Sequence, residues 1–420
     1  MNVTDASAAG RGSQSGPRRP WRGRRVVLGI SGGIAAYKAV HVARQLTQLG
    51  ATVDVVMTRS ARAFVGSITF EALTGRAVHS GILEEGAALD HIRLAREADV
   101  VCVAPATADL IARAAAGRAD DLLTAILLAT RAPVVLCPAM NDAMWTHAQT
   151  QRNLAHVTAA LGYRVAGPGV GPLAQGEGAG PGRMLEPEEI VEHIGRALEA
   201  PGPFTGQHVV VTAGPTREPV DPVRVLSNRS SGRMGYAIAS AAWRRGAEVT
   251  LISGPTVLAP PVGARFVRIE TAEQMAQALT DALRDAQVLI MAAAVADFRP
   301  ADPATFKLRR SEGPPQLALE PAVDVLGATR HARPAGLVTV GFALETGDGR
   351  RHAREKLVSK DLDLIVLNDA TESGAGFETD TNHVVLIDRA GQEEDVPLQP
   401  KTEVAEIILD RIEPLLAVAG

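Results

Sequence analysis

Residues 25–38 decide how the first half of the chain folds. They are Arg25-Val26-Val27-Leu28-Gly29-Ile30-Ser31-Gly32-Gly33-Ile34-Ala35-Ala36-Tyr37-Lys38. An apolar run of strand length leads through glycines into a helix-length segment, an order that is typical of α/β domains with a mostly parallel sheet. We therefore predict a strand at residues 25–30 and a helix that begins near Gly33.

The turn between this strand and this helix predicts an anion site. Glycines let backbone N–H groups approach an anion at the positive end of the helix, and Ser31 adds a hydroxyl donor. The G-x-G-x-x-G spacing of dinucleotide folds is absent, and the second strand ends at Met57-Thr58-Arg59 without a carboxylate for a ribose. The turn therefore favours a mononucleotide such as a flavin over NAD. A tight turn with no ligand is the alternative.

The same alternation of apolar runs and amphipathic segments continues outward and starts again after a Pro/Gly-containing linker. Further strands are predicted at residues 52–58, 100–104, 134–137, 208–212, 248–252, 288–292, 338–342 and 364–367, and helices at 187–198 and 235–245. Seven glycines and three prolines in residues 167–182 predict a mobile loop without regular structure. The predicted division is a disordered tail at 1–24, a first domain at 25–199, a linker at 200–206 and a second domain at 207–420.

Composition excludes several classes of protein. Hydrophobic residues are 46% of the 420 residues, and no apolar run approaches the ~18 residues of a spanning helix, so a membrane protein is excluded. The net charge of −4 and dispersed basic residues argue against nucleic acid as a partner. Two cysteines, Cys102 and Cys137, lie in apolar runs, which argues against disulfides and a cysteine-rich zinc site and fits a reducing cytoplasm.

Two polar stretches at the ends of predicted strands, residues 104–109 and 137–141, fall where open α/β sheets bind ligands. Together with Gly29–Lys38 and with Gly-Pro-Gly-Arg-Met at 180–184, in this order and followed by the second domain, they resemble the flavin-dependent cysteine decarboxylases. The closest resemblance is to the bifunctional family that joins a phosphopantothenoylcysteine decarboxylase to a phosphopantothenate–cysteine ligase. It covers residues 25–420. The resemblance implies a flavodoxin-like or Rossmann-like FMN-binding decarboxylase domain, followed by a Rossmann-like CTP-dependent ligase domain.

The resemblance also implies roles for residues of the first domain. The residues expected at FMN are Ser31, Gly32, Gly33, Thr58, Ala106 and Thr107. His91 is implied as the active-site histidine, Asn141 as the contact of the substrate carboxylate, and Arg183 as a flap residue for the substrate phosphate. The chemistry agrees, because oxidation of a cysteine thiol needs a hydride acceptor such as FMN, and an amide with an imidazole orients a carboxylate without trapping it as an ion pair. On its own, His91 also fits a surface position on a helix.

One departure from the family concerns the flap. Family members often carry a cysteine just before the glycine-rich run, where it protonates the enethiolate. Here the stretch 173–184 contains no cysteine, and Gln175 falls nearest that position. Gln175 lacks the acidity of a thiol, so solvent or Glu177 is expected to donate the proton.

The second domain has its own anion motif, in residues 211–224 and 227–235. Hydroxyls, glycines and arginines crowd before a predicted helix, which favours a site for more than one phosphate group over a solvated polar loop. In the ligase family this region resembles the site for phosphopantothenate and its acyl-nucleotide intermediate, which implies Arg224 and Asn228. The resemblance implies Asn228 and Lys307 as catalytic residues of the ligase.

Residues 290–298 predict one edge of a nucleotide-binding site. They form a buried strand followed by small residues and a carboxylate, and Asp297 could hold a ribose, a base edge or a metal. By resemblance the CTP site comprises Met291, Ala292, Ala293, Asp297, Lys307, Ala322, Val323, Asp324, Val325, Phe342, Lys356 and Lys360. Lys356 and Lys360 share one helical face, which is also what a solvated basic face looks like. The family's Asn-Pro-Asp appears here as Ala322-Val323-Asp324, so only the aspartate is kept.

These observations predict a fused enzyme with small-molecule substrates. CTP and Mg²⁺ would activate the carboxylate of 4′-phosphopantothenate, cysteine would displace CMP, and the FMN domain would decarboxylate the product to 4′-phosphopantetheine. The sequence identifies no metal ligands. Flavin sites of the family that the chain resembles lie between subunits of a trimer, and its ligase domain resembles a dimerising module, so the resemblance implies a homo-oligomer, a dodecamer. Two alternatives are another flavoprotein decarboxylase or prenyl-FMN synthase fused to an unrelated module, and a non-catalytic flavin-binding regulatory subunit.

Overall fold

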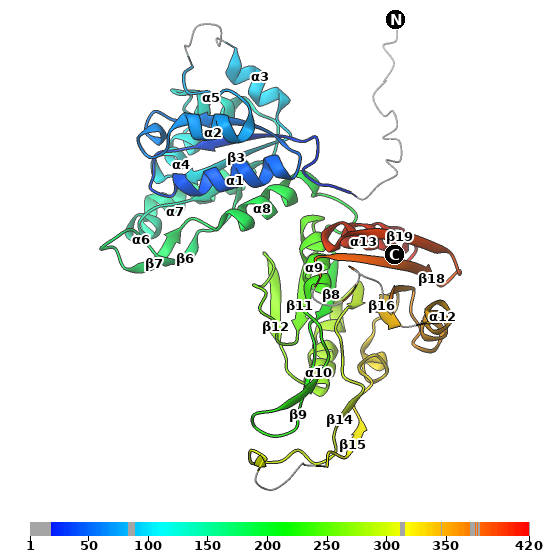
Figure 1. The fold of residues 1–420 in the computed structure, drawn as a ribbon. Helices are drawn as coiled ribbons and strands as arrows, with labels where there is room; N and C mark the ends of the chain where they lie inside the picture. The colour runs from blue at the N-terminus through cyan, green and yellow to red at the C-terminus, as the bar shows by residue number, and fades with distance from the viewer. Residues whose placement is uncertain are drawn as a thin grey trace, which may run out of the picture.

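The structure consists of two α/β domains that follow one another along the chain (Figure 1). This computed structural model describes residues 18–82, 89–310, 316–345, 347–369, 374, 376 and 379–419. Residues 1–17 of the predicted tail lie outside that description. The prediction of two α/β domains is confirmed.

The first domain is built on a five-stranded parallel sheet with the order β2-β1-β3-β4-β5. Its strands are β1 (Arg25–Ile30), β2 (Thr52–Met57), β3 (Val100–Ala106), β4 (Val134–Pro138) and β5 (Arg164–Val165). Helices cover both faces, so two separate apolar clusters form, one on each side of the sheet. The chain leaves β1 toward β2 and leaves β3 toward β4, in opposite directions. The loops after β1 and β3 therefore part at a switch point, where such sheets bind ligands.

The helices described in this domain are α1 (Ala36–Gln48), α2 (Ser67–Thr74), α3 (Asp90–Glu97), α4 (Ala108–Ala115), α5 (Leu122–Ala129), α6 (Asp142–Thr146), α7 (Ala148–Ala159) and α8 (Pro187–Glu199), with a 3₁₀ turn at Ala61–Ala63. α1 begins at Ala36 rather than near Gly33, because Gly32 and Gly33, which have low helix propensity, remain in the turn. That turn lies at the edge of the sheet where we expect a ligand to bind.

The glycine-rich segment 167–182 is more regular than its composition predicts. β6 (Gly169–Pro172) and β7 (Ala179–Arg183) pair as an antiparallel hairpin. Gly176 and Gly178 at its tip have φ values of 86° and 79°, which glycine adopts without a steric cost. The glycines form the turn of a hairpin instead of abolishing regular structure, so the prediction of an irregular loop is wrong. We call residues 169–183 the flap hairpin.

The second domain is built on an eight-stranded sheet with the order β12-β11-β8-β13-β16-β17-β18-β19. Its strands are β8 (His208–Ala213), β11 (Glu248–Ser253), β12 (Ala264–Arg268), β13 (Val288–Met291), β16 (Val338–Glu345), β17 (Leu364–Asp369), β18 (Thr381–Asp388) and β19 (Glu393–Pro400). The strands from β12 to β17 are parallel, and β18 and β19 continue the sheet antiparallel. β8 and β13 meet at a second switch point, because the chain leaves β8 toward β11 and β13 toward β16.

Two layers of helices cover this sheet, again with one apolar cluster on each face. The helices described are α9 (Arg233–Arg244), α10 (Ala272–Ala282), α11 (Val325–Ala328), α12 (Gly349–Ser359) and α13 (Lys401–Ala419), with 3₁₀ turns at Leu283–Asp285 and Arg330–Ala332. α9 and α13 belong to one face, and α10, α11 and α12 to the other. α9 therefore runs from the ligand edge of the sheet back toward the first domain (Figure 1).

Two small hairpins extend from the second domain, away from the first (Figure 1). β9 (Arg217–Pro219) pairs with β10 (Val225–Ser227), and β14 (Phe298–Pro300) pairs with β15 (Leu319–Pro321). We call them the arm hairpins. Their large apolar side chains that are exposed in this single chain are Val223, Val225, Leu226, Phe298, Phe306, Leu317 and Leu319. These side chains give the arm an unpartnered apolar surface.

The two domains meet where α8 packs on α9. Arg244 of α9 donates to Glu192 of α8 at 2.7 Å, and its guanidinium lies 5.0 Å from the centre of the Trp21 ring. Trp21 is buried and donates to the carbonyl of Val191. The predicted tail through Arg24 is therefore wrong for its last residues, because an indole and its hydrogen bond anchor them to the fold.

Candidate functional site

The loops after β1 and β3 are joined at the first switch point. Ser31 Oγ donates to the carbonyl of Pro105 at 2.8 Å and accepts from the backbone N–H of Thr107 at 3.0 Å. Its proton is therefore directed to Pro105, and not to an anion as the sequence suggested. Ser31 in this state fixes the shape of the turn, while Thr107 also begins α4 as its N-cap.

The turn itself leaves backbone donors available. A Cβ on Gly32 would lie 2.3 Å from the Cβ of Ser60, so only glycine fits against the loop after β2. The N-cap of α1 is Ala35, whose side chain cannot accept a hydrogen bond. No side chain caps α1, but the N–H groups of Ala36 and Lys38 already donate to the carbonyls of Gly33 and Ala35, so an anion would bind the N–H groups of the glycine turn that precedes α1. Thr58 is buried and accepts from the N–H of Ala61, which shapes the same loop.

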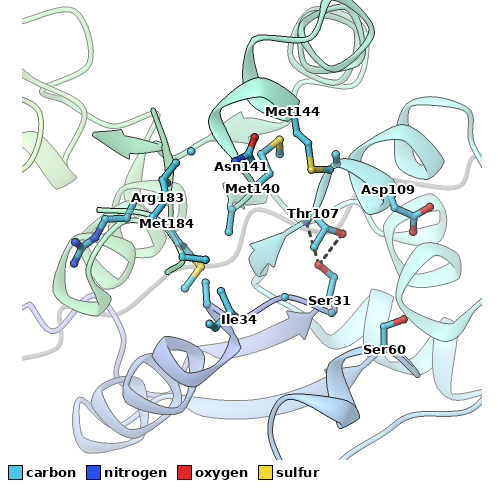
Figure 2. Close-up of a pocket in the computed structure, with 18 of the residues that line it drawn as sticks. Ser31, Ile34, Ser60, Thr107, Asp109, Met140, Asn141, Met144, Arg183 and Met184 are labelled. Atoms are coloured by element: carbon cyan, nitrogen blue, oxygen red, sulfur yellow. Dashed lines mark hydrogen bonds between the residues drawn. The ribbon is translucent and has the colours of Figure 1, made fainter. Parts of the chain in front are cut away.

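A cavity of about 920 Å³ lies over this turn. Figure 2 shows Ser31 and Thr107 hydrogen-bonded on one side of it and Met140, Asn141 and Met144 on another. Of the residues predicted for this site, those that line the cavity are Ser31, Gly32, Gly33, Thr58, Thr107, Asn141 and Arg183. The structure thus brings seven predicted residues, from five segments of the chain, to one cavity.

The flap hairpin docks on the loop that carries Asn141. Met140 N–H donates to the carbonyl of Gly182 at 3.0 Å, and a Cβ on Gly182 would lie 2.2 Å from the carbonyl oxygen of Met140. Gly182 also has a φ of 132°, so a side chain there meets both strain and collision. Asn141 Oδ1 accepts from the N–H of Ala143 and caps α6. Its amide nitrogen has no protein partner among the described residues, so it can donate to a ligand.

One carboxylate holds two cations beside the flap. Glu186 accepts from Arg183 at 2.6 Å and from Lys38 of α1 at 2.9 Å. The hydrogen bond from Lys38 and, after it, that from Arg183 outweigh partial burial and lower the pKa of Glu186. Lys38 also donates to the carbonyl of Met184. Arg183 is therefore held to the protein, and an anion would have to compete with Glu186 for it.

Two predicted residues of this domain lie apart from the cavity. Ala106 is fully buried at the end of β3, where its carbonyl accepts from the N–H of Ala139. His91 lies in the first turn of α3 and is absent from the cavity lining, and its Nδ1 is buried without a partner among the described residues. Its neighbour Asp90 binds His79 and Arg93, each at 2.8 Å. α3 is thus firmly placed, but this chain alone does not bring His91 to the site.

The second switch point has a comparable junction of loops. Asn228 Nδ2 donates to the carbonyls of Ala294 and Val295, at 3.3 and 2.9 Å. Thr212 at the end of β8 accepts from the N–H of Ala293. These bonds join the loop before α9 to the loop after β13, and both loops line one cavity.

This cavity has a volume of about 640 Å³. The predicted residues that line it are Asn228, Met291, Ala292, Ala293, Asp297, Ala322, Val323, Asp324, Val325, Phe342, Lys356 and Lys360. Lys356 donates to the carbonyl of Phe342 at 2.8 Å, and burial lowers the pKa of this lysine. Burial alone would raise the pKa of Asp324, but a hydrogen bond from Lys360 at 2.5 Å outweighs it and the pKa is lowered. The cavity therefore combines anchored ammonium groups with carboxylates.

Two predicted ligase residues lie outside this cavity lining. Arg224 donates to Asp221 at 2.8 Å and to the carbonyl of Leu308 at 3.0 Å, which ties the arm hairpins together. Lys307 is exposed on the arm. Both residues belong to the arm, and this single chain does not place them at the nucleotide cavity.

Known proteins resemble both halves of the chain. Residues 14–199 match the family described as Flavoprotein, and residues 204–415 match the DNA/pantothenate metabolism flavoprotein C-terminal domain. The coenzyme A biosynthesis bifunctional protein CoaBC of Mycobacterium bovis is 47% identical over 409 residues, which covers 94% of this chain and 97% of the relative. This chain belongs to the coenzyme A biosynthesis bifunctional protein family.

Other relatives extend the match. The protein of the same name from Vibrio cholerae is 44% identical over 397 residues, 93% of this chain and 98% of the relative. A crystal structure of the C-terminal domain of such a protein has 38% identity and a TM-score of 0.44, and covers 51% of this chain and 98% of its own. The two curated relatives and the two family models confirm, across both domains, the family membership that the motifs suggested.

Within this family member, the structure adds residues that the motifs did not single out. At the flavoprotein cavity they include Lys38, Arg59, Ser60 and Met144, and at the second cavity Arg233, Asn382 and Lys401. Asn368, a candidate for the site edge from its place after an apolar run, also lines the second cavity. Glu177 of the flap lines the first cavity, whereas Gln175 does not. Lys38 and Arg233 lie inside the quoted motifs, so their place in the sequence could have identified them as cavity residues. Lys401 lies far from any motif.

Neither a dedicated metal cage nor a membrane span is found in the part of the chain that the structure describes. No group of three or more His, Cys, Asp or Glu side chains is placed to hold a metal there. No described helix is both long and apolar enough to cross a bilayer.

Proposed function

We propose that this protein catalyses two consecutive steps of coenzyme A synthesis. The second domain ligates 4′-phosphopantothenate with cysteine at the expense of CTP, and the first decarboxylates 4′-phosphopantothenoylcysteine with FMN. One observation carries the proposal: in a chain of this family, the motif residues of each domain converge on a cavity at a sheet switch point. We expect the reaction to take place in the cytoplasm.

The first cavity fits FMN. The N–H groups of the glycine turn before α1 suit its phosphate, and Ile34, Met140 and Met144 offer apolar surface to a flat ring system. When bound, FMN would supply the hydride acceptor that oxidation of the cysteine side chain needs, and it would give the hydride back afterwards. We assign the phosphate contact to the turn at Ser31–Gly33, with Thr58 and Thr107 shaping it.

Asn141 is proposed to orient the substrate carboxylate. Its Nδ2 is available to donate, while its Oδ1 is fixed by the N–H of Ala143, so the amide presents a donor to the cavity. A neutral donor orients a carboxylate without holding it as an ion pair, and loss of carbon dioxide stays possible. Arg183 is proposed to bind the substrate phosphate after leaving Glu186.

His91 is proposed to act in the site of a neighbouring copy of the chain. It lies outside its own cavity, with Nδ1 unpartnered among the described residues. Ile34, Tyr37, Phe64 and Ile68, on the turn, α1 and the segments after β2, are exposed in the single chain. If copies of the chain packed through these exposed apolar side chains, the side chains would be buried and the His91 imidazole of one copy could reach the cavity of another. This arrangement agrees with the trimer that the family resemblance implies.

The final protonation is proposed to use Glu177 or solvent. Glu177 lines the cavity, and Gln175 does not. The flap hairpin can keep bulk water out while one carboxyl group or one water delivers the proton.

The second cavity fits CTP with Mg²⁺. Lys356 and Lys360 are proposed to bind phosphates, and Asp297 the ribose or the metal. Mg²⁺ needs only one or two protein carboxylates when substrate phosphates complete its shell, so the absence of a dedicated cage among the described residues is compatible with it. When bound, the metal offsets triphosphate charge at the attacked phosphorus.

Asn228 is proposed to position the acyl phosphate, because it anchors the two loops that line the cavity. Lys307 and Arg224 are proposed to act across a dimer of ligase domains. The exposed apolar surface of the arm hairpins, which carry both residues, supports such a dimer. Trimers of one domain and dimers of the other close into a dodecamer.

The test is incubation of purified protein with 4′-phosphopantothenate, CTP, Mg²⁺ and cysteine. We expect CMP and pyrophosphate, followed by carbon dioxide and 4′-phosphopantetheine. A flavoprotein fused to an unrelated module would give no CMP, and a regulatory subunit would give no product. Light scattering at micromolar concentration tests the assembly, and a monomeric mass would contradict the proposed roles of His91 and Lys307.

A further inference from the structure

One carboxylate oxygen, Oε1 of Glu186, binds two cations at the base of the flap hairpin. It accepts from Arg183 at 2.6 Å and from Lys38 of α1 at 2.9 Å. Both cations line the first cavity, and Glu186 does not. In Figure 2 the Arg183 side chain extends away from Asn141, which we assigned to the substrate carboxylate. The function proposed above gives the Glu186 carboxylate no role of its own.

The two cations differ in how easily they can leave this carboxylate. Lys38 is buried, and its Nζ also donates to the carbonyl of Met184 at 2.9 Å. The side chain of Arg183 is 36% exposed, and Glu186 is its only hydrogen-bond acceptor among the described residues. Lys38 is therefore fixed, whereas Arg183 can turn toward a ligand by giving up a single partner.

The departure of Arg183 would not leave Glu186 unpaired. The carboxylate would keep the ammonium group of Lys38, and its side chain is 46% exposed, so water can take the place of the guanidinium. The hydrogen bond from Lys38 is the largest cause of the lowered pKa of Glu186. Glu186 therefore stays ionised without Arg183 and remains able to take it back. A partly exposed ion pair of this kind is weak enough to exchange.

We propose that Glu186 is a positioning residue that competes with the substrate phosphate for Arg183 and thereby limits how tightly the first domain holds its product. The inference deepens the proposed decarboxylation and rests on it. The substrate 4′-phosphopantothenoylcysteine and the product 4′-phosphopantetheine carry the same phosphate ester. A contact to this phosphate stabilises substrate and product alike, so it does not accelerate the chemical step, and it slows release of the product. A second partner for Arg183 limits that cost.

The experiment is isothermal titration of the full-length, FMN-loaded protein with 4′-phosphopantetheine and, separately, with pantetheine, which lacks the phosphate. Glu186→Gln keeps the length of the side chain and removes its charge. It should bind 4′-phosphopantetheine about two- to fivefold more tightly than the wild type does, because Arg183 no longer has an ionic partner in the protein. Its affinity for pantetheine should be unchanged. The matched control is Glu188→Gln, the same change at an exposed position of α8, which should bind both ligands as the wild type does.

A second set of variants separates competition from a general disturbance of the flap. Arg183→Gln should weaken binding of 4′-phosphopantetheine by about tenfold, because it removes a charge-assisted hydrogen bond. Adding Glu186→Gln to that variant should have no further effect, since a residue that acts only through Arg183 has nothing left to act on. If Glu186→Gln does not fold because Lys38 loses its ionic partner, Lys38→Met combined with Glu186→Gln leaves no unpaired buried charge and carries the same expectation.

The outcomes distinguish this inference from the proposed function. A wild type that releases no carbon dioxide contradicts the decarboxylase, and an Arg183→Gln variant with wild-type affinity for 4′-phosphopantetheine contradicts the phosphate contact of Arg183. If both of these hold, the competition is overturned when Glu186→Gln binds 4′-phosphopantetheine no more tightly than the wild type does. It is also overturned when Glu186→Gln changes the affinity for pantetheine by the same factor.

Discussion

The two cavities offer an anion different kinds of partner. In the first domain the groups available to an anion are backbone N–H groups of the glycine turn before α1, while the cations Lys38 and Arg183 are already bound to Glu186. In the second domain Lys401 is buried and Lys356 is half-buried, and among the described residues both donate to carbonyl oxygens. Burial lowers the pKa of both lysines, so both gain from an arriving anion. Backbone donors suit a cofactor that stays bound, and ammonium groups held by carbonyl oxygens suit a nucleotide whose charge changes in every turnover.

The strongest way to separate the two sites is His91→Asn. We expect release of carbon dioxide from 4′-phosphopantothenoylcysteine to fall by about 100-fold or more, because asparagine cannot exchange a proton as imidazole does. CMP formation should be unchanged, since His91 is on α3 of the first domain. The measurement is the rate of each half-reaction on the same preparation. Retained decarboxylation would show that the catalytic imidazole is misassigned.

Asn228→Asp should impair the site of the second domain and leave that of the first domain unchanged. The carboxylate cannot donate to the carbonyls of Ala294 and Val295, and it brings negative charge to a phosphate site. We expect ligase kcat/KM to fall roughly 10- to 100-fold. Flavin content and decarboxylation should stay at wild-type levels. Equal losses in both half-reactions would contradict two independent sites.

Glu199→Gln tests the junction that joins the two domains. Burial, and after it the charge of Glu406, raises the pKa of Glu199 to about 7, and its Oε2 has no hydrogen-bond partner among the described residues. A carboxyl group with a raised folded-state pKa contributes stability that is complete below its unfolded pKa and is lost as the pH rises through 7.

We therefore expect Glu199→Gln to unfold at a higher temperature than the wild type at pH 8, and at nearly the same temperature at pH 4, below the unfolded-state pKa of the carboxyl group. The gain should be of the order of 1–3 kcal/mol at most. Glu188→Gln, an exposed change on the same helix, is the control and should show no such pH dependence. A gain that is equal at both pH values would mean that Glu199 does not titrate in this range.

The smallest expected effect is that of Gln175→Cys. Gln175 does not line the first cavity, and Glu177 does, so a thiol there should change turnover by no more than about threefold. Stopped-flow absorbance of the flavin is the measurement. Bleaching that persists in the wild type and disappears in Gln175→Cys would show that protonation limits the natural enzyme and that Glu177 or water does not suffice.

Local patterns predicted the parts of the fold that are locally encoded. The apolar runs at β1, β8 and β13 predicted the bounds of these strands to within a residue or two, because strands buried on both faces are continuously hydrophobic. β18 and β19 were missed, and the latter has mostly polar, exposed residues. The flap hairpin was missed because its glycines suggested disorder. Trp21 was missed because its partners, Val191 and Arg244, are remote in sequence.

Local patterns likewise predicted only those site residues that lie inside a motif. Residues inside the motifs, such as Asn141 and Asn228, line the cavities, because the motifs follow strands that end at one edge of a sheet. Lys401 carries no motif, and only the tertiary contact of α13 with α9 brings it to the second cavity. His91 and Lys307 were named by resemblance, and the single chain places neither at a cavity. Contacts between copies of a chain leave no local signature in its sequence.

The α8–α9 seam also determines how this protein can be engineered. Arg196 of α8 lies 4.7 Å from the centre of the Trp243 ring and donates to the carbonyls of Gly246 and Ala247. If the gene were split at Pro201, the first fragment would carry Arg196 without its carbonyl acceptors. The second fragment would carry the Trp243 indole exposed to solvent. Each fragment would then need solubilising substitutions at this surface before it could serve as a stand-alone catalyst or as a module in a fusion with another enzyme.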